Sequence, residues 1–193
     1  MSEPESSQDL GVVPAGGMAE AQLAGAAFFG PSGKAIRARQ EQGYWCWAAA
    51  VQMLRRHLDL SARAQCEIAS RRLGKLCCVA PSPCDVQLPF DHVTRLLEEN
   101  EMRSERKRAL LDKERFFAEL FAGRPILLAD IFENGRDGHM RVAFGWQQLR
   151  RGELVVRVAD PAKGGVESIL FEELQRSRWR ETWYRIEVLN VAS

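Results

Sequence analysis

The chain has 193 residues, of which 46% are apolar, and this length and composition suit one domain with a sizeable core. Its 27 lysines and arginines nearly balance its 26 aspartates and glutamates, so the net charge of +1 gives no electrostatic reason to expect nucleic acid or an anionic membrane as a partner. No stretch approaches the ~20 consecutive apolar residues of a membrane-spanning helix, and we expect a soluble protein.

Residues 1–35 are predicted to form a flexible N-terminal tail, and residues 36–193 the folded domain. Ser, Gly, Pro and Ala dominate the tail, in which only 18–28 shows a helical period. Its first residues are acidic where a secretory signal needs lysine or arginine, so we expect a cytoplasmic protein as made, which only a specialised secretion system would deliver into a target cell. The pair Gly16-Gly17 is interpreted as part of a linker rather than as a processing site.

An apolar helix is predicted from Cys46 to about Leu58, with no proline or internal glycine to interrupt it. A cysteine at a helix N-terminus lies where unpaired backbone N–H groups and the helix dipole favour the thiolate, which is the nucleophilic form. Cys46 is therefore the candidate nucleophile. Trp45 and Trp47 flank it, and we expect them to pack in the core or to form a wall of the cleft.

Three more helices are predicted after this one, at 62–73, 90–100 and 113–121. An irregular loop rich in cysteine and proline precedes the second of them. The densest basic stretch, 103–108, is interpreted as a solvated edge strand or loop rather than as a binding patch.

The remaining cysteines lie close together in the chain, at Cys66, Cys77, Cys78 and Cys84. Their spacing lacks the paired Cys-x2-Cys of zinc ribbons, so a zinc site is the least favoured interpretation. A disulfide between Cys66 and either Cys77 or Cys78 would require surroundings outside a reducing cytoplasm. We favour reduced thiols that pack a loop-rich region.

The C-terminal half is predicted to consist of strands at 126–132, 139–148, 154–160, 167–170 and 182–188. Arg151 and Gly152 turn the central pair, so one hairpin would bring His139, at the start of one strand, close to Asp160, at the end of the next. Helices first and antiparallel strands afterwards is the order of an α+β fold.

Cys46, His139 and Asp160 together supply a nucleophile, a general base and a carboxylate that can orient the base. The other histidines do not fit this set. His57 is placed on the exposed end of its helix and His92 opens a helix, so we predict a structural role for both.

The ordered motifs resemble the papain-like cysteine peptidases, and within them a compact bacterial branch that contains bacteriocin-leader peptidases and bacterial effector proteases. The matching pieces are Gln-x5-Cys-Trp-Ala-Ala, Gln-Cys-Glu-Ile-Ala at 65–69, the cysteines at 77, 78 and 84, Gly-His-Met-x-Val-x-x-Gly-Trp ending at Trp146, and Ala-Asp-Pro ending at Pro161. They cover residues 40 to about 188. The resemblance implies a papain-like fold, in which an N-terminal helical half that carries the nucleophile packs on an antiparallel sheet half that carries the histidine and the aspartate.

The resemblance also implies a role for each residue. Cys46 would be the nucleophile and His139 the general base and acid, while Asp160 would orient His139. Gln40 would donate to the oxyanion; Gln42 also precedes the cysteine, but only Gln40 has the six-residue offset of the family. We expect no cofactor and no metal.

The predicted function is that of a cysteine endopeptidase that cleaves a protein or peptide through an acyl-enzyme, as a bacterial effector or toxin delivered into another cell. The same residues would also serve an acyl-transfer enzyme, such as a glutamine deamidase or a transglutaminase. A third alternative is a leader-peptide maturation protease, for which we would expect a fused transporter. The expected partners are the protein or peptide substrate and a cognate inhibitor or immunity protein, with no nucleic acid and no membrane.

Overall fold

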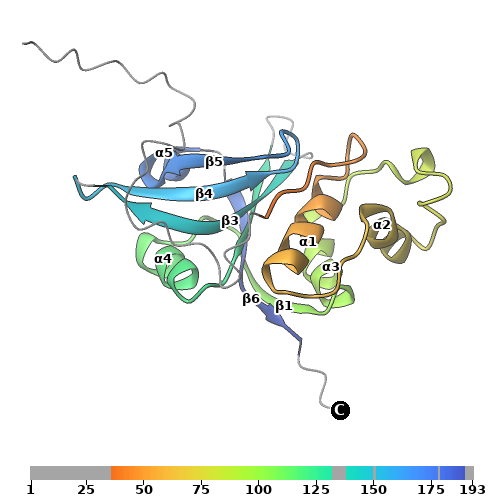
Figure 1. Cartoon of the computed structure of the whole chain (residues 1–193), viewed down its shortest axis with the longest axis horizontal. Coiled ribbons are helices and arrows are strands. Elements are labelled where there is room, and N and C mark those ends of the chain that lie inside the picture. The colour runs from red at the N-terminus through yellow and green to blue at the C-terminus, as the bar shows by residue number, and fades with distance from the viewer. Residues whose placement is uncertain (1–35, 132–137, 150, 178, 190–193) are drawn as a thin grey trace, which may run out of the picture.

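A computed structural model describes residues 36–131, 138–149, 151–177 and 179–189 (Figure 1). The helical half consists of α1 (Cys46–His57), α2 (Gln65–Leu73) and α3 (Val93–Glu99), with short 3-10 turns at Ser82–Cys84 and Phe90–His92. The sheet half consists of β1 (Met102–Lys107), α4 (Lys113–Phe121), β2 (Ile126–Ile131), β3 (Gly138–Gln148), β4 (Leu154–Asp160), β5 (Gly165–Leu170), α5 (Phe171–Arg176) and β6 (Trp179–Val188). The predicted α+β class, with helices before an antiparallel sheet, is confirmed.

All neighbouring strands of the six-stranded sheet are antiparallel, in the order β1-β6-β2-β3-β4-β5. The last strand, β6, returns to lie between β1 and β2. In Figure 1, α1, α2 and α3 stand together on one side of the molecule, beside the sheet that carries α4 and α5. The helical half therefore meets the sheet along one boundary, and the candidate site lies there.

Alternate residues of the central strand β2 belong to different hydrophobic clusters. Leu127 and Ala129 pack in a cluster with residues of α1, α2 and α3, whereas Ile126 and Leu128 pack with residues of α4 and α5. Because successive side chains of a strand point to opposite faces, both faces of β2 are covered. This explains why its sequence is a continuous apolar run instead of an alternating one.

The basic stretch predicted as an edge strand or loop forms β1, at the edge of the sheet. Its arginines are paired: Arg103 with Glu187, and Arg106 with Glu181 at 2.7 Å and with Asp91 at 2.6 Å. Charged side chains on an edge strand hinder pairing with other strands. The edge-strand interpretation is confirmed.

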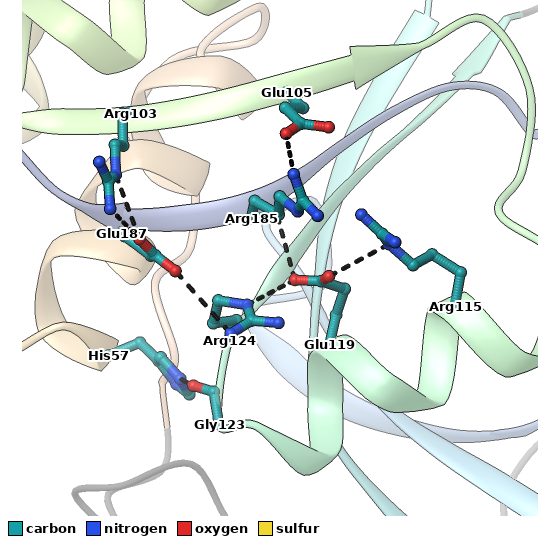
Figure 2. A network of polar contacts seen from close by, with 9 residues as sticks. All are labelled: His57, Arg103, Glu105, Arg115, Glu119, Gly123, Arg124, Arg185 and Glu187. Atoms are coloured by element: carbon teal, nitrogen blue, oxygen red, sulfur yellow. Dashed lines mark hydrogen bonds and ion pairs between the residues drawn. The ribbon is translucent and has the colours of Figure 1, made fainter.

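A polar network lies at the C-terminal end of α1, opposite the end that carries the cysteine (Figure 2). Glu119 is buried and accepts hydrogen bonds from Arg124 Nε at 2.6 Å and from the backbone N–H of Arg185 at 3.2 Å. His57 Nε2 donates to the Gly123 carbonyl at 2.9 Å, and burial lowers the pKa of His57. The expectation that His57 is exposed was wrong, because the turn between α4 and β2 covers it.

Two helix boundaries differ from the sequence prediction for local reasons. The helix expected at 62–73 begins at Gln65, since Ala64 is extended and its N–H donates to the Glu67 carboxylate at 2.7 Å. The helix expected at 90–100 begins with a 3-10 turn. The short helix α5 was not predicted, because six residues with buried Phe171 and Leu174 are too few to display a period.

Four of the five cysteines form disulfides, which pair Cys66 with Cys78 and Cys77 with Cys84. The favoured interpretation of reduced thiols was therefore wrong: the loop after α2 has few apolar residues to bury, and covalent links take the place of a core there. Cys46 is free and partly buried. Within the described ranges, no group of three or more His, Cys, Asp or Glu side chains is arranged to hold a metal ion.

The described part of the chain begins at Ile36. The predicted tail, its helical segment 18–28 and the pair Gly16-Gly17 lie outside the described residues. Among the helices that are described, none has the length and apolar character needed to cross a membrane.

Candidate active site

Cys46 is the first residue of α1, and the helix N-terminus beside it is open to an anion. Trp45 occupies the N-cap position without a side-chain cap, and the first turn contains no acidic residue. The first N–H groups of a helix have no partner within the helix, and the helix dipole adds positive potential there. The start of α1 therefore offers positive potential beside Cys46.

His139 and Asp160 are brought together by the β3–β4 hairpin. The two strands are antiparallel with Val142 opposite Ala159, so the start of β3 and the end of β4 meet at one edge. His139 Nε2 donates to Asp160 Oδ1 at 2.7 Å, and the same oxygen accepts from the N–H of Ala162 at 2.9 Å. The carboxylate is held by its own turn and in turn orients the imidazole.

Cys46 is the second group that acts on the imidazole of His139. Burial alone would lower the pKa of His139, but the hydrogen bonds and charges of Asp160 and Cys46 outweigh it and raise the pKa to about 9. Burial would likewise raise the pKa of Asp160, yet its hydrogen bond with His139 holds that pKa below the usual range. At neutral pH the arrangement therefore contains an imidazolium and a carboxylate.

These side chains line one cleft with a volume of about 690 Å³. Cys46, His139, Asp160 and Gln40 all border it, and Leu88, Pro89 and Phe90 form an apolar wall on the side of the helical half. The sequence predicted these four residues as a set, and the structure brings them to a single cavity. His92 is exposed and, like His57, is not among the residues that border the cleft.

Gln40 borders the cleft, whereas Gln42 does not. The Nε2 group of Gln40 donates to the carbonyls of Gln42, at 3.0 Å, and of Gly43, while its buried Oε1 has no hydrogen-bond partner in the described part of the chain. An amide nitrogen has two hydrogens, and both are used within the loop. Gln40 would have to rotate, or share a hydrogen, to donate to an oxyanion above Cys46.

Hydrogen-bond donors next to Cys46 bind the segment 84–86, which leads into the apolar wall. They are Trp45 Nε1 to the Cys84 carbonyl at 2.7 Å, the Tyr44 N–H to Asp85 Oδ1 at 2.7 Å, and Trp47 Nε1 to the Val86 carbonyl at 3.0 Å. Both tryptophans are buried, as expected. The disulfide at Cys84 is therefore part of the support of the cleft, a role that the sequence analysis missed.

Gly138 is a second residue that the sequence analysis missed. A Cβ atom at this position would overlap the ring of Phe90, from the helical half, and the carbonyl oxygen of Asp130 on β2. Only glycine lets the ring pack directly on the backbone beside His139. The signal in the sequence was the glycine that precedes the histidine.

Comparison with known proteins agrees with this geometry. The model of the family described as papain-like cysteine protease AvrRpt2 matches residues 34–177, a range that includes Gln40, Cys46, His139 and Asp160. A comparison with curated proteins finds no match. Since the family match covers well over half of the chain, the protein belongs to the papain-like cysteine proteases of the AvrRpt2 family.

Proposed function

We propose that the protein is a cysteine endopeptidase in which Cys46 is the nucleophile, His139 the general acid and base, and Asp160 the group that orients His139. The observation that carries the proposal is the hydrogen bond between His139 and Asp160 in an open cleft that Cys46 also lines. Family membership supports peptidase activity in general. The roles of the individual residues rest on the geometry.

Each step of the reaction has a residue suited to it. The Cys46 thiolate attacks the carbonyl carbon of the scissile bond, and the protonated His139 gives its proton to the leaving amine, which leaves a thioester. Neutral His139 then takes a proton from the water that attacks the thioester, and the acid product and free thiolate follow. The N–H of Cys46, with a rotated Gln40 amide, would stabilise the oxyanion in both halves of the reaction.

The substrate that fits this cleft is an extended polypeptide. The cavity is open and about 690 Å³ in volume, and its wall at Leu88, Pro89 and Phe90 offers apolar surface to side chains near the scissile bond. We further propose that the protein acts as an effector or toxin outside the cell that makes it, where it would meet a target protein or a cognate inhibitor. The disulfides support export, because thiols in a bacterial cytoplasm are kept reduced.

The test is incubation of wild type and Cys46→Ala with a complex mixture of protein-derived peptides, followed by mass spectrometry of new termini. New termini should appear with wild type and be absent with Cys46→Ala. Conversion of glutamine to glutamate without new termini would favour the deamidase alternative, and cross-linked peptides would favour the transglutaminase. A wild type that does none of these, although its Cys46 is alkylated rapidly at neutral pH, would contradict the endopeptidase proposal.

A further inference from the structure

The side chain of Gln65, the first residue of α2, is buried against the backbone of the loop that precedes Cys46. Gln65 is only 1% exposed. Its Oε1 accepts from the N–H of Glu41 at 2.9 Å, and its Nε2 donates to the carbonyl of Arg39 at 2.8 Å. Burial of an amide is unfavourable unless its hydrogen bonds are made. The same two bonds that satisfy Gln65 therefore fix two groups of the loop.

The two groups bound by Gln65 lie on either side of Gln40. The N–H of Gln40 itself points the other way and donates to the carbonyl of Pro161, directly after Asp160, at 3.0 Å. Backbone groups that alternate in this way are typical of an extended strand held from both sides. The loop is thus clamped between α2 and the turn that carries Asp160.

The clamp determines which side chain of the loop faces the cleft. In an extended segment a slip of one residue turns every side chain to the opposite side. With Arg39 and Glu41 bound to Gln65, the side chain of Gln40 borders the cleft together with Cys46. A misplacement of about 1 Å in a reacting or stabilising group costs on the order of 10²-fold in rate, so this register matters for catalysis.

Gln65 also connects the loop to the helix of the nucleophile. Its Nε2 lies 3.3 Å from Oε1 of Gln52 on α1, and Gln52 in turn donates to the carbonyl of Arg63 at 3.0 Å. We propose that Gln65 is a positioning residue, which sets the register of the loop so that the amide of Gln40 is presented to the oxyanion. This inference rests on the proposed function, because it gives Gln40 a role only if an oxyanion forms above Cys46.

The test compares two reactions of the same thiol. Acylation by the p-nitrophenyl ester of an N-blocked glycine forms an oxyanion, whereas alkylation by iodoacetamide does not. Gln65→Met removes both bonds to the loop with little change in volume and should slow acylation about 10- to 100-fold, while alkylation stays within about twofold of wild type. Gln52→Met is the matched control: it removes an amide from the same network without touching the loop and should leave both rates near wild type.

A double variant shows whether Gln65 acts through Gln40. In a Gln40→Ala background, Gln65→Met should slow acylation no further, because the amide that it positions is already gone. Losses that multiply, or wild-type acylation by a folded Gln65→Met protein, would overturn the proposal. Should Gln65→Met not fold, Gln65→Glu serves instead, since it keeps the acceptor for Glu41 and places a carboxylate oxygen against the Arg39 carbonyl.

Hydrogen exchange separates this inference from the proposed function. The amide of Glu41 should exchange faster in Gln65→Met than in wild type and Gln52→Met, whether or not the enzyme is active. Unchanged exchange at Glu41 would overturn the clamp. A wild type that neither forms an acyl-enzyme nor is alkylated at Cys46 would contradict the proposed function, and exchange at Glu41 would then decide on the clamp alone.

Discussion

In the sheet half of the cleft, His139 and Asp160 are placed by the main chain of one hairpin, whereas in the helical half Cys46 and Gln40 depend on particular side chains and disulfides. The β3–β4 ladder runs from Val142 opposite Ala159 to the far end of the hairpin. Many backbone hydrogen bonds therefore contribute to the placement of His139 and Asp160. The loop and the helix start are held by two bonds of Gln65 and by one bond each of Trp45 and Trp47. We infer that the loss of one side-chain hydrogen bond can disturb the nucleophile side without unfolding the protein, whereas the base side depends on no single side-chain bond of this kind.

The largest effect should come from removal of one reacting group on each side of the cleft. Cys46→Ala and His139→Ala should each lower peptide or ester hydrolysis by at least about 10⁴-fold, because such residues act as a unit. Cys46 is only partly buried, so Cys46→Ala should melt close to wild type, whereas His139→Ala loses the bond to Asp160 and should melt at a lower temperature. Steady-state kinetics and thermal unfolding measure both. Wild-type-like turnover in either variant would refute the assigned mechanism.

Gly138→Ala should give the next largest effect, since it pushes the two halves apart beside His139. The new methyl group would overlap the Phe90 ring and the Asp130 carbonyl, and overpacking of this kind costs about 1–3 kcal/mol in free energy of unfolding. Hydrolysis should fall with it, because the His139 backbone has to move. Gly165→Ala, where a Cβ meets nothing within 4 Å, is the matched control for denaturant unfolding and kinetics. Equal stability of the two variants would show that the Phe90 ring can move aside without a loss in free energy of unfolding.

A smaller effect is expected when the disulfide between Cys77 and Cys84 is removed. The double variant Cys77→Ser/Cys84→Ser should lose about 2–3 kcal/mol of stability and become less active, because the segment 84–86 that binds the donors around Cys46 is no longer anchored. Hydrogen exchange should accelerate at 84–90. The β3–β4 hairpin provides the internal control, because its hydrogen exchange should not change. If exchange accelerated there to the same extent, the proposed difference between the two halves would be contradicted.

The smallest effect is expected from a change in pH that titrates His139. At the midpoint of this titration the rate of hydrolysis should be half of its maximum. Its pKa in the folded protein, about 9, lies above the ordinary value of 6.5. Its contribution to stability is therefore complete below about pH 6.5 and is lost as the pH rises through about 9. Hydrolysis should decline over the same upper range, because the proton donor for the leaving group disappears.

A nuclear magnetic resonance titration of the His139 ring would sharpen this prediction. In Cys46→Ala the pKa of His139 should fall below the wild-type value, since one of the two partners that raise it is gone. Asp160 remains and should keep the ring oriented. An identical titration in both proteins would mean that the thiol and the imidazole do not interact.

Local signals made some elements predictable. The bounds of α4 and β4 agree with the expected ranges: Asp112 caps α4 through the N–H of Arg115 at 2.9 Å, and Gly152, with φ of 83°, turns the hairpin before β4. The four residues predicted for the site share one cleft: Cys46 lies at a helix start just after Gln40, and His139 and Asp160 lie at the start and the end of one hairpin. Their individual roles stay predictions.

What could not be predicted depends on contacts between distant segments. The adjacent cysteines 77 and 78 have different partners, and nothing in their spacing selects Cys84 for one and Cys66 for the other. The burial of His57 depends on Gly123, far along the chain. The role of Gln65 likewise arises only when α2 packs against the loop around Gln40. Such contacts leave no periodic pattern in the sequence.

The disulfides and the free Cys46 make opposite demands on the solution around the protein. Cys46, the proposed nucleophile, has to stay reduced, while the pairs Cys66–Cys78 and Cys77–Cys84 in the same half have to stay oxidised. Which of them is oxidised depends on the reduction potential of each pair relative to its surroundings. An assay buffer with a large excess of dithiol would keep Cys46 reduced, but it would also reduce the disulfides that support the cleft. Purified enzyme stored in such a buffer would then be mistaken for an inactive protein. Activity should be recorded across a series of glutathione redox buffers before any variant is judged.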